Sequence, residues 1–81
     1  MYYVYVLLST KDQKRYIGST NDLQRRLDQH QKGQVFSTKN RRPINLIYSE
    51  EYDTESKARQ REKYFKTHKG YTELQRILKT N

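Results

Sequence analysis

The sequence predicts an α+β fold whose elements follow the order β-β-α-β-α-α in a single domain, residues 1–81. The chain opens with two tyrosine-rich apolar runs around a short polar connection, which is typical of a β-hairpin. Three later segments begin at helix-capping residues and carry apolar side chains at helical spacing. A further apolar run lies between the first two of these segments and is predicted as the third strand.

The predicted hairpin joins two strands, residues 2–8 and residues 16–18. Because side chains alternate along a strand, Tyr16 and Gly18 share one face of the second strand. If Tyr5 faces the same way, two phenols lie on one surface beside a glycine, where a phosphate or another backbone can approach closely. Plain architecture is the alternative, since an aromatic ring suits a half-buried pleated sheet.

The first helix is predicted over about residues 22–31, with Asn21 as its N-cap residue and Gln24 completing a capping box. Arg26 and His30 are spaced i, i+4, so they are neighbours near the sheet-facing side of this helix. An exposed charge for Arg26 and a cation at the helix C-terminus for His30 are the alternative interpretations.

The remaining segments complete the order. A basic loop over residues 33–43 suits phosphate contacts or is a solvated, mobile connection. Its polar and cationic side chains include Ser37, Thr38, Lys39, Arg41 and Arg42. Residues 44–52 are predicted as the third strand, and Gly70 is predicted as a break before a short last helix that begins at Thr72.

The second helix is predicted from near Glu55 to about His68, and it carries a carboxylate among apolar residues. Ala58, Glu62 and Phe65 are spaced i, i+4, i+7 along one stripe of this helix. A buried charge is costly unless it is paired or bound to a metal ion. Glu62 therefore has either a cationic partner or a cation to bind.

The charge balance favours a nucleic acid as partner. The chain holds 17 Lys and Arg against 9 Asp and Glu, a net charge of +8, and the cations gather in residues 24–42 and 57–69. A basic balance in a small domain is typical of nucleic-acid binding. A high isoelectric point without any polyanionic partner is the alternative.

Composition also excludes several classes of protein. The chain has no cysteine, which excludes disulfide frameworks and thiolate zinc sites. No apolar segment approaches the length of a membrane span, and the opening residues Met-Tyr-Tyr-Val lack the basic head of a signal peptide. We therefore expect a soluble, cytoplasmic protein that does not associate with a membrane.

Taken in this order, the motifs resemble those of GIY-YIG nucleases, in particular the small stand-alone bacterial type. Tyr3-Val4-Tyr5 stands where the first signature triplet belongs, and Tyr16-Ile17-Gly18 matches the second. Residues 22–30 resemble the family's first helix with its arginine and histidine, and residues 58–66 resemble the helix that carries its metal-binding glutamate. The resemblance implies a small three-stranded antiparallel sheet flanked by helices.

The resemblance also implies a role for each of five side chains. Tyr5 would be the general base or the group that orients it, and Tyr16 would support the nucleophile or the scissile phosphate. Arg26 would steady the charge that develops on the phosphate, and His30 would assist Tyr5 or the leaving group. Glu62 would hold a single divalent cation, Mg²⁺ or Mn²⁺. Since a free tyrosine has a pKa of about 10, we expect Arg26, the metal ion and the basic field to lower the pKa of Tyr5.

Two positions depart from the family pattern. Tyr3 replaces the glycine of the first triplet. The family's asparagine downstream of the glutamate has no clear match, because only Asn81 follows Glu62. Its phosphate-orienting role is absent or is taken by Lys66 or Thr67.

We therefore expect a metal-dependent endonuclease that hydrolyses phosphodiester bonds in DNA, directed by DNA structure such as branches, flaps or single strands, and linked to repair or recombination. RNA as substrate and a protein partner for targeting stay open. A catalytically weak or inactive nucleic-acid-binding module and a docking domain of a repair assembly are the alternatives. The residues predicted to contact nucleic acid are Gly18, Arg25, Lys39, Arg41, Arg42 and Lys66.

Overall fold

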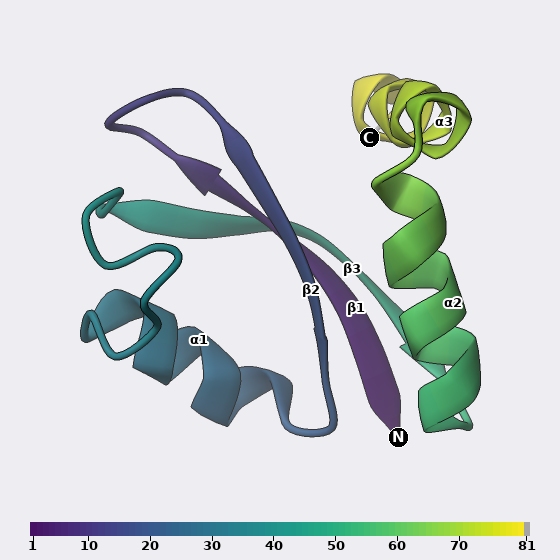
Figure 1. Cartoon of the computed structure of the whole chain (residues 1–81), viewed down its shortest axis with the longest axis horizontal. Helices are drawn as coiled ribbons and strands as arrows, with labels where there is room; N and C mark the ends of the chain where they lie inside the picture. Colours follow the sequence, from purple (N-terminus) through teal and green to yellow (C-terminus); the bar gives the residue numbers. More distant parts are fainter. Residues whose placement is uncertain (81) are drawn as a thin grey trace.

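The computed structural model describes residues 1–80, which form a three-stranded sheet with helices on both of its faces (Figure 1). The elements in chain order are β1 (Tyr2–Ser9), β2 (Arg15–Thr20), α1 (Leu23–Gln31), β3 (Ile44–Tyr52), α2 (Glu55–Phe65) and α3 (His68–Thr80). The sheet is antiparallel with the strand order β2-β1-β3. The predicted α+β order and the antiparallel sheet are thus confirmed. No helix within residues 1–80 is long and apolar enough to cross a membrane.

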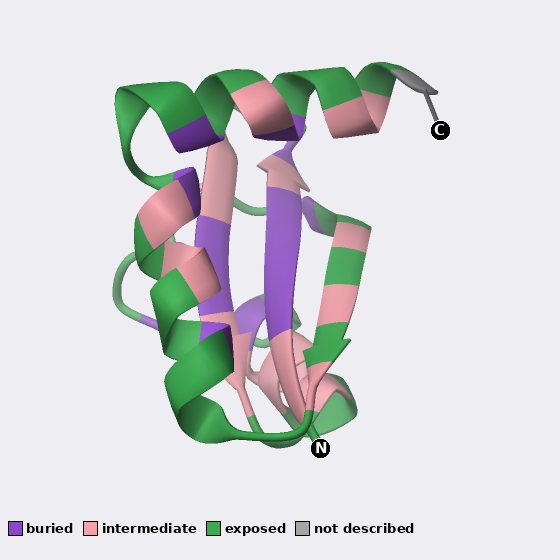
Figure 2. Cartoon of the chain, turned by 90° about the vertical axis from the view of Figure 1, so that its right-hand side faces the viewer, coloured by how far each residue is buried: buried purple, intermediate pink, exposed green. Residues whose placement is uncertain are grey.

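β1 is the central strand, and both of its faces are covered. The four residues from Val4 to Leu7 are all buried, which explains why this stretch is continuously apolar rather than alternating. α1 lies on one side of the sheet, and α2 and α3 lie on the other (Figure 1). Phe65 and Leu74 belong to the core beneath α2 and α3, whereas Tyr5 and Leu7 belong to the core beneath α1. Figure 2 shows the buried centre of the sheet from the side of α2 and α3.

α1 begins one residue later than predicted, because Asp22 rather than Asn21 is its N-cap residue. The Asp22 carboxylate accepts a hydrogen bond of 3.1 Å from the backbone N–H of Arg25. That bond satisfies one of the donors left open in the first turn of the helix. The expected capping box between Asn21 and Gln24 is therefore wrong by one position.

The predicted break at Gly70 is wrong, because Gly70 lies inside α3. The long second helix expected from the sequence instead ends at Phe65. Thr67 connects the two helices: its hydroxyl donates to the Tyr64 carbonyl at 2.6 Å and accepts from the Gly70 N–H at 3.0 Å. A Cβ atom on Gly70 would lie 1.7 Å from the Tyr64 carbonyl oxygen. The close approach of the two helices, and not a chain break, requires glycine here.

This contact reverses the usual effect of a Gly→Ala substitution in a helix. Helix propensity alone predicts that Gly70→Ala stabilises α3 by about 1 kcal/mol. The overlap with Tyr64 predicts a destabilisation of about 1–3 kcal/mol, the usual cost of overpacking. Urea unfolding measures the difference, with Lys69→Ala as the control at an exposed position of the same helix. A Gly70→Ala variant as stable as the parent would contradict the close contact.

Candidate active site

Four of the five predicted catalytic side chains meet on the α1 side of the sheet. The Tyr5 phenol oxygen lies 3.0 Å from Nε2 of His30. The Tyr16 ring packs edge-on against the same imidazole, with 5.1 Å between centroids. Nε of Arg26 donates to the Tyr5 oxygen at 3.4 Å. The strands supply the two phenols and α1 supplies the two nitrogen-bearing side chains, as the i, i+4 spacing on the helix predicts.

Gly18 makes the room in which this cluster forms. It lies directly opposite Tyr5 in the ladder between β1 and β2. A Cβ atom at this position would lie 2.6 Å from the Tyr5 oxygen and 3.1 Å from a ring carbon of Tyr16. The glycine is therefore explained by the two phenols that pack over it. A phosphate contact at Gly18 stays a prediction, and the space beside its backbone is already filled by Tyr5.

His30 is buried and has a hydrogen-bond partner on each ring nitrogen. Nδ1 lies 2.7 Å from the Thr38 hydroxyl, and Nε2 faces Tyr5. His30 and Thr38 have no exposed surface, and Tyr5 is 1% exposed. Because a neutral imidazole has one donor and one acceptor nitrogen, it links the two hydroxyls in one continuous chain of hydrogen bonds. The alternative interpretation of His30 as a helix-terminal cation is therefore wrong.

Three side chains of the loop of residues 33–43 pack against the rest of the fold, although the sequence predicts phosphate contacts for them. Thr38 turns inward to His30 instead of outward, which sequence reasoning missed. Arg41 forms an ion pair of 2.9 Å with Asp12 in the β1–β2 turn. Arg42 lies over Gly33, where a Cβ atom would be 2.8 Å from its guanidinium carbon. Phosphate contacts by these two arginines stay predictions, and both already have a structural role.

Burial sets the protonation states in the cluster. It raises the pKa of Tyr5 to about 12, and the hydrogen bond from Arg26 opposes this rise only in part. The expected lowering of the Tyr5 pKa is therefore wrong for the protein alone, because the phenol is withdrawn from water. Burial, together with the nearby Arg26 charge, lowers the pKa of His30 to about 4. At neutral pH the phenol and the imidazole are both uncharged, and Arg26 carries the positive charge.

Glu62 reaches the same edge of the sheet from α2, on the opposite face. Its Oε1 accepts a hydrogen bond of 2.6 Å from the Ser19 hydroxyl at the end of β2. Its Oε2 pairs with the Lys66 ammonium at 2.8 Å, and the side chains of Glu62 and Lys66 are 22% and 53% exposed. Although burial acts against it, the hydrogen bonds from Lys66 and Ser19 hold the pKa of Glu62 below its ordinary value. Glu62 is therefore ionised at neutral pH and has the cationic partner that the sequence left open.

The donor set around Glu62 fits a hard cation that shares its coordination with water and substrate. Within residues 1–80, no group of three or more His, Cys, Asp or Glu side chains is arranged to hold a metal ion. Mg²⁺ usually keeps several waters and binds through one or two carboxylates together with substrate phosphates. Glu62 supplies such a carboxylate, and a cation at Oε2 would take the place of the half-exposed Lys66 ammonium.

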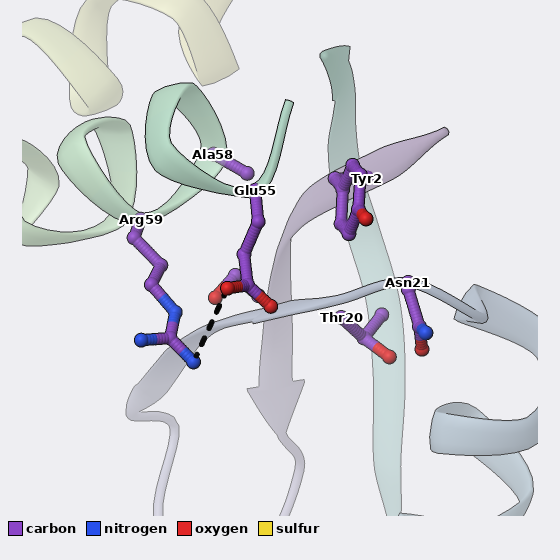
Figure 3. Close-up of a pocket in the computed structure, with 7 residues that line it drawn as sticks. Tyr2, Thr20, Asn21, Glu55, Ala58 and Arg59 are labelled. Atoms are coloured by element: carbon purple, nitrogen blue, oxygen red, sulfur yellow. Dashed lines mark ion pairs between the residues drawn. The ribbon is translucent and has the colours of Figure 1, made fainter. Parts of the chain in front are cut away.

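A cleft of about 220 Å³, which Ser19 helps to line, opens between the end of β2 and α2 (Figure 3). Its lining residues are Tyr2, Ser19, Thr20, Asn21, Glu55, Ala58 and Arg59. Arg59 and Glu55 extend from α2 into this space and form an ion pair of 3.8 Å, in which both side chains are well exposed. The cleft therefore holds a solvated guanidinium, and its charge also acts, after those of closer groups, to lower the pKa of Glu62.

The other positions named from the sequence lie around this centre. Arg25 and Lys39 are exposed, whereas Lys66 is paired with Glu62. Thr67 is engaged in the junction between α2 and α3. Asn81 lies outside the residues that the structure describes.

Acid should destabilise the fold through His30. Its pKa of about 4 in the folded protein lies below the ordinary value of 6.5, so the unfolded chain takes up the proton first as the pH falls. Stability should therefore decrease from pH 6.5 down to pH 4, by up to about 3 kcal/mol.

Urea unfolding between pH 7 and pH 5 tests this, because carboxyl groups with lowered pKa values act at lower pH. His30→Gln should flatten the slope in that window. Titration of the His30 ring by NMR gives a second readout in the unaltered protein. A ring that titrates near pH 6.5 would contradict the buried, neutral imidazole.

Known proteins share this sequence pattern and this fold. The sequence model of the GIY-YIG catalytic domain matches residues 1–75. UPF0213 protein SSP2268 of Staphylococcus saprophyticus is 38% identical over 77 residues, which cover 94% of this chain and 93% of that protein. UPF0213 protein YazA of Bacillus subtilis is 41% identical over 63 residues, which cover 76% of this chain and 64% of that protein. The solution NMR structure of UPF0213 protein BH0048 from Bacillus halodurans superposes with a TM-score of 0.57 at 28% identity, covering 95% of this chain and 85% of that one. Because the catalytic-domain model covers residues 1–75 and a relative of almost the same length is 38% identical, the chain belongs to the GIY-YIG family.

Proposed function

We propose that this protein is a metal-dependent endonuclease that hydrolyses phosphodiester bonds in DNA. GIY-YIG domains are nuclease domains, and nucleases of this family typically use a divalent metal ion. The observation that carries the proposal is that both parts of the candidate site lie at the edge strand β2. The cluster around Tyr16 lies on one face of this strand, and the Ser19–Glu62 contact lies on the other. Burial is the main cause that raises the pKa of Tyr5, and the Glu62 charge adds only weakly to this rise.

Phosphodiester hydrolysis needs an activated water, a Lewis acid and a cationic group near the phosphate. Glu62 would hold Mg²⁺ or Mn²⁺, which supplies the Lewis acid and lowers the pKa of a bound water. Arg26 keeps a fixed position through its bonds to Tyr5 and to Gln29, at 3.4 Å and 3.0 Å. Its planar guanidinium has further donors that match phosphate oxygens.

The different exposure of the two phenols supports a different role for each. Tyr5 is 1% exposed, so we assign it to orientation of the site rather than to direct contact with solvent water. Tyr16 is only partly buried, which supports contact of its phenol with the attacking water or the scissile phosphate. Thr38 is a positioning residue, because its hydroxyl fixes His30, and His30 in turn fixes the Tyr5 hydroxyl.

The finer parts of the proposal concern the substrate. The net charge of +8 favours binding through phosphates, which carry no sequence information, so a preference for DNA structure such as flaps or branches is proposed over one for sequence. A role in repair or recombination, a cytoplasmic location and a protein partner that targets the enzyme belong to the same proposal. The competing function is a nucleic-acid-binding module that has retained the fold without useful cleavage.

A cleavage assay separates these two functions. The substrates are end-labelled linear duplex, flap, junction and single-stranded DNA, with a matched single-stranded RNA, each incubated with Mg²⁺, Mn²⁺ or EDTA. We expect metal-dependent cleavage of at least one structured DNA and none in EDTA. Binding without cleavage of any substrate by either ion would favour the binding module.

Glu62→Gln should remove cleavage and leave the fold intact. Both side chains of the Glu62–Lys66 pair are partly exposed. Exposed ion pairs contribute only about 0–1 kcal/mol, so the free energy of unfolding should change little. Loss of an electrostatic group that acts in the transition state typically lowers the rate by about 10²–10³-fold. Mg²⁺ or Mn²⁺ should raise the melting temperature of the parent but not that of the variant.

Glu51→Gln on β3 is the matched control, since it removes an exposed carboxylate away from the site. It should keep both the cleavage and the stabilisation by metal ions. A Glu62→Gln protein that is strongly destabilised yet still cuts DNA would refute the role of Glu62 as metal ligand.

A further inference from the structure

Phe36 is the most exposed large apolar side chain within residues 1–80, with 84% of its surface accessible. The Lys39 ammonium lies 4.9 Å from the centroid of its ring. A single exposed apolar residue is common and needs no function of its own. Three further features of the surrounding loop make this ring different.

The first feature is that the ring projects from a fixed turn. Val35 is 8% exposed and Thr38 is fully buried, so the residues on both sides of Phe36 are anchored in the fold. The carbonyl of Val35 accepts hydrogen bonds from the N–H groups of Thr38 and Lys39 at 3.1 Å and 2.9 Å. The ring is therefore held outward by its backbone, and little conformational entropy is lost when a ligand covers it.

The second feature is the charge around the ring. No Asp or Glu occurs in the sequence between Asp28 and Glu50, while Lys32, Lys39 and two arginines do. Arg41 is paired with Asp12, but Lys39 forms no ion pair within residues 1–80 and keeps its charge beside the ring. A ligand that suits the Phe36 ring and the Lys39 ammonium has a flat apolar face and a negative charge close to that face. An unpaired nucleobase with its phosphate has all three properties.

The third feature is the position of the turn. Phe36 is two residues from Thr38, whose hydroxyl contacts His30 in the candidate active site. Two residues of chain span at most about 7 Å, so the backbone of Phe36 lies within about 7 Å of the residue that fixes His30. A base stacked on Phe36 would therefore lie against the loop that also anchors the cluster.

We propose that Phe36, together with Lys39, forms a stacking site for one unpaired nucleobase of DNA. The site gives the protein a preference for DNA that contains single-stranded nucleotides over fully paired duplex. The effect on cleavage rests on the proposed nuclease function, whereas the stacking itself is measured by binding alone.

The test measures binding in EDTA, where no cleavage occurs. The probes are a short single strand that carries 2-aminopurine and the same strand annealed to its complement. Stacking on an aromatic side chain contributes about 5-fold to 150-fold in affinity per base. Phe36→Ala should weaken single-strand binding by that factor, abolish the quenching of 2-aminopurine on binding and change duplex affinity by less than about 2-fold.

Two further variants distinguish a stacked ring from a merely apolar one. Phe36→Trp should retain single-strand affinity and quenching, whereas Phe36→Leu should lose both, because only an aromatic face stacks on a base. Tyr71→Ala is the matched control, since Tyr71 is a 37% exposed ring with the Arg15 guanidinium 5.5 Å from its centroid, on α3. It should leave the preference for single strands unchanged. Lys39→Gln should weaken both probes and reduce the salt dependence of binding.

Equal losses on single strand and duplex, or full affinity with Phe36→Leu, would overturn the stacking site. The comparison of Phe36→Trp with Phe36→Leu decides the question even if Phe36→Ala folds poorly. Ring-dependent binding without any cleavage would leave the stacking site intact and refute the nuclease. If the protein cleaves DNA and neither cleavage nor single-strand binding changes in the Phe36 variants, the stacking site is refuted and the nuclease function stands.

Discussion

The candidate active site depends on one buried chain of hydrogen bonds that runs from Thr38 through His30 to Tyr5. The three residues come from the loop after α1, from α1 and from β1, so the chain fixes three separate segments relative to one another. In a buried, low-dielectric place each of these bonds is costly to leave unmade. The same burial keeps His30 neutral and the Tyr5 hydroxyl protonated, and Gly18 provides the space in which the phenol lies.

A small domain has little room for a deep pocket, and here the site is assembled across the edge of its sheet. Alternation along β2 places Tyr16 and Gly18 toward α1 and turns Ser19 toward α2, where it meets Glu62. The neutral hydrogen-bonded cluster and the ionised carboxylate therefore lie on opposite faces of one edge strand. This separation keeps Glu62 partly exposed and available to a cation, while the phenol and imidazole stay dry.

Local patterns in the sequence predicted most of the fold and the members of the cluster. Alternation in the hairpin and the i, i+4 spacing of Arg26 and His30 are properties of one element each, and the structure brings them together as expected. Features that depend on contact between distant segments could not be predicted. Thr38 lies in a loop with no periodicity, and the raised pKa of Tyr5 follows from burial by other elements. The sequence predicts a helix break at Gly70, because the reason for the glycine lies in the neighbouring helix, where Tyr64 leaves no space for a side chain.

The central claim is that Thr38 and Tyr5 act as one unit on the cleavage reaction, and a double-mutant cycle of single-turnover cleavage rates tests it most directly. Tyr5→Phe should slow cleavage by about 10–100-fold, the usual cost of removing a side chain that orients a functional group. Thr38→Val, which keeps the side-chain shape and removes the hydroxyl, should slow it less. Because Thr38 acts through the Tyr5 hydroxyl, the double variant should be no slower than Tyr5→Phe alone. Effects that simply multiply in the double variant would contradict the account.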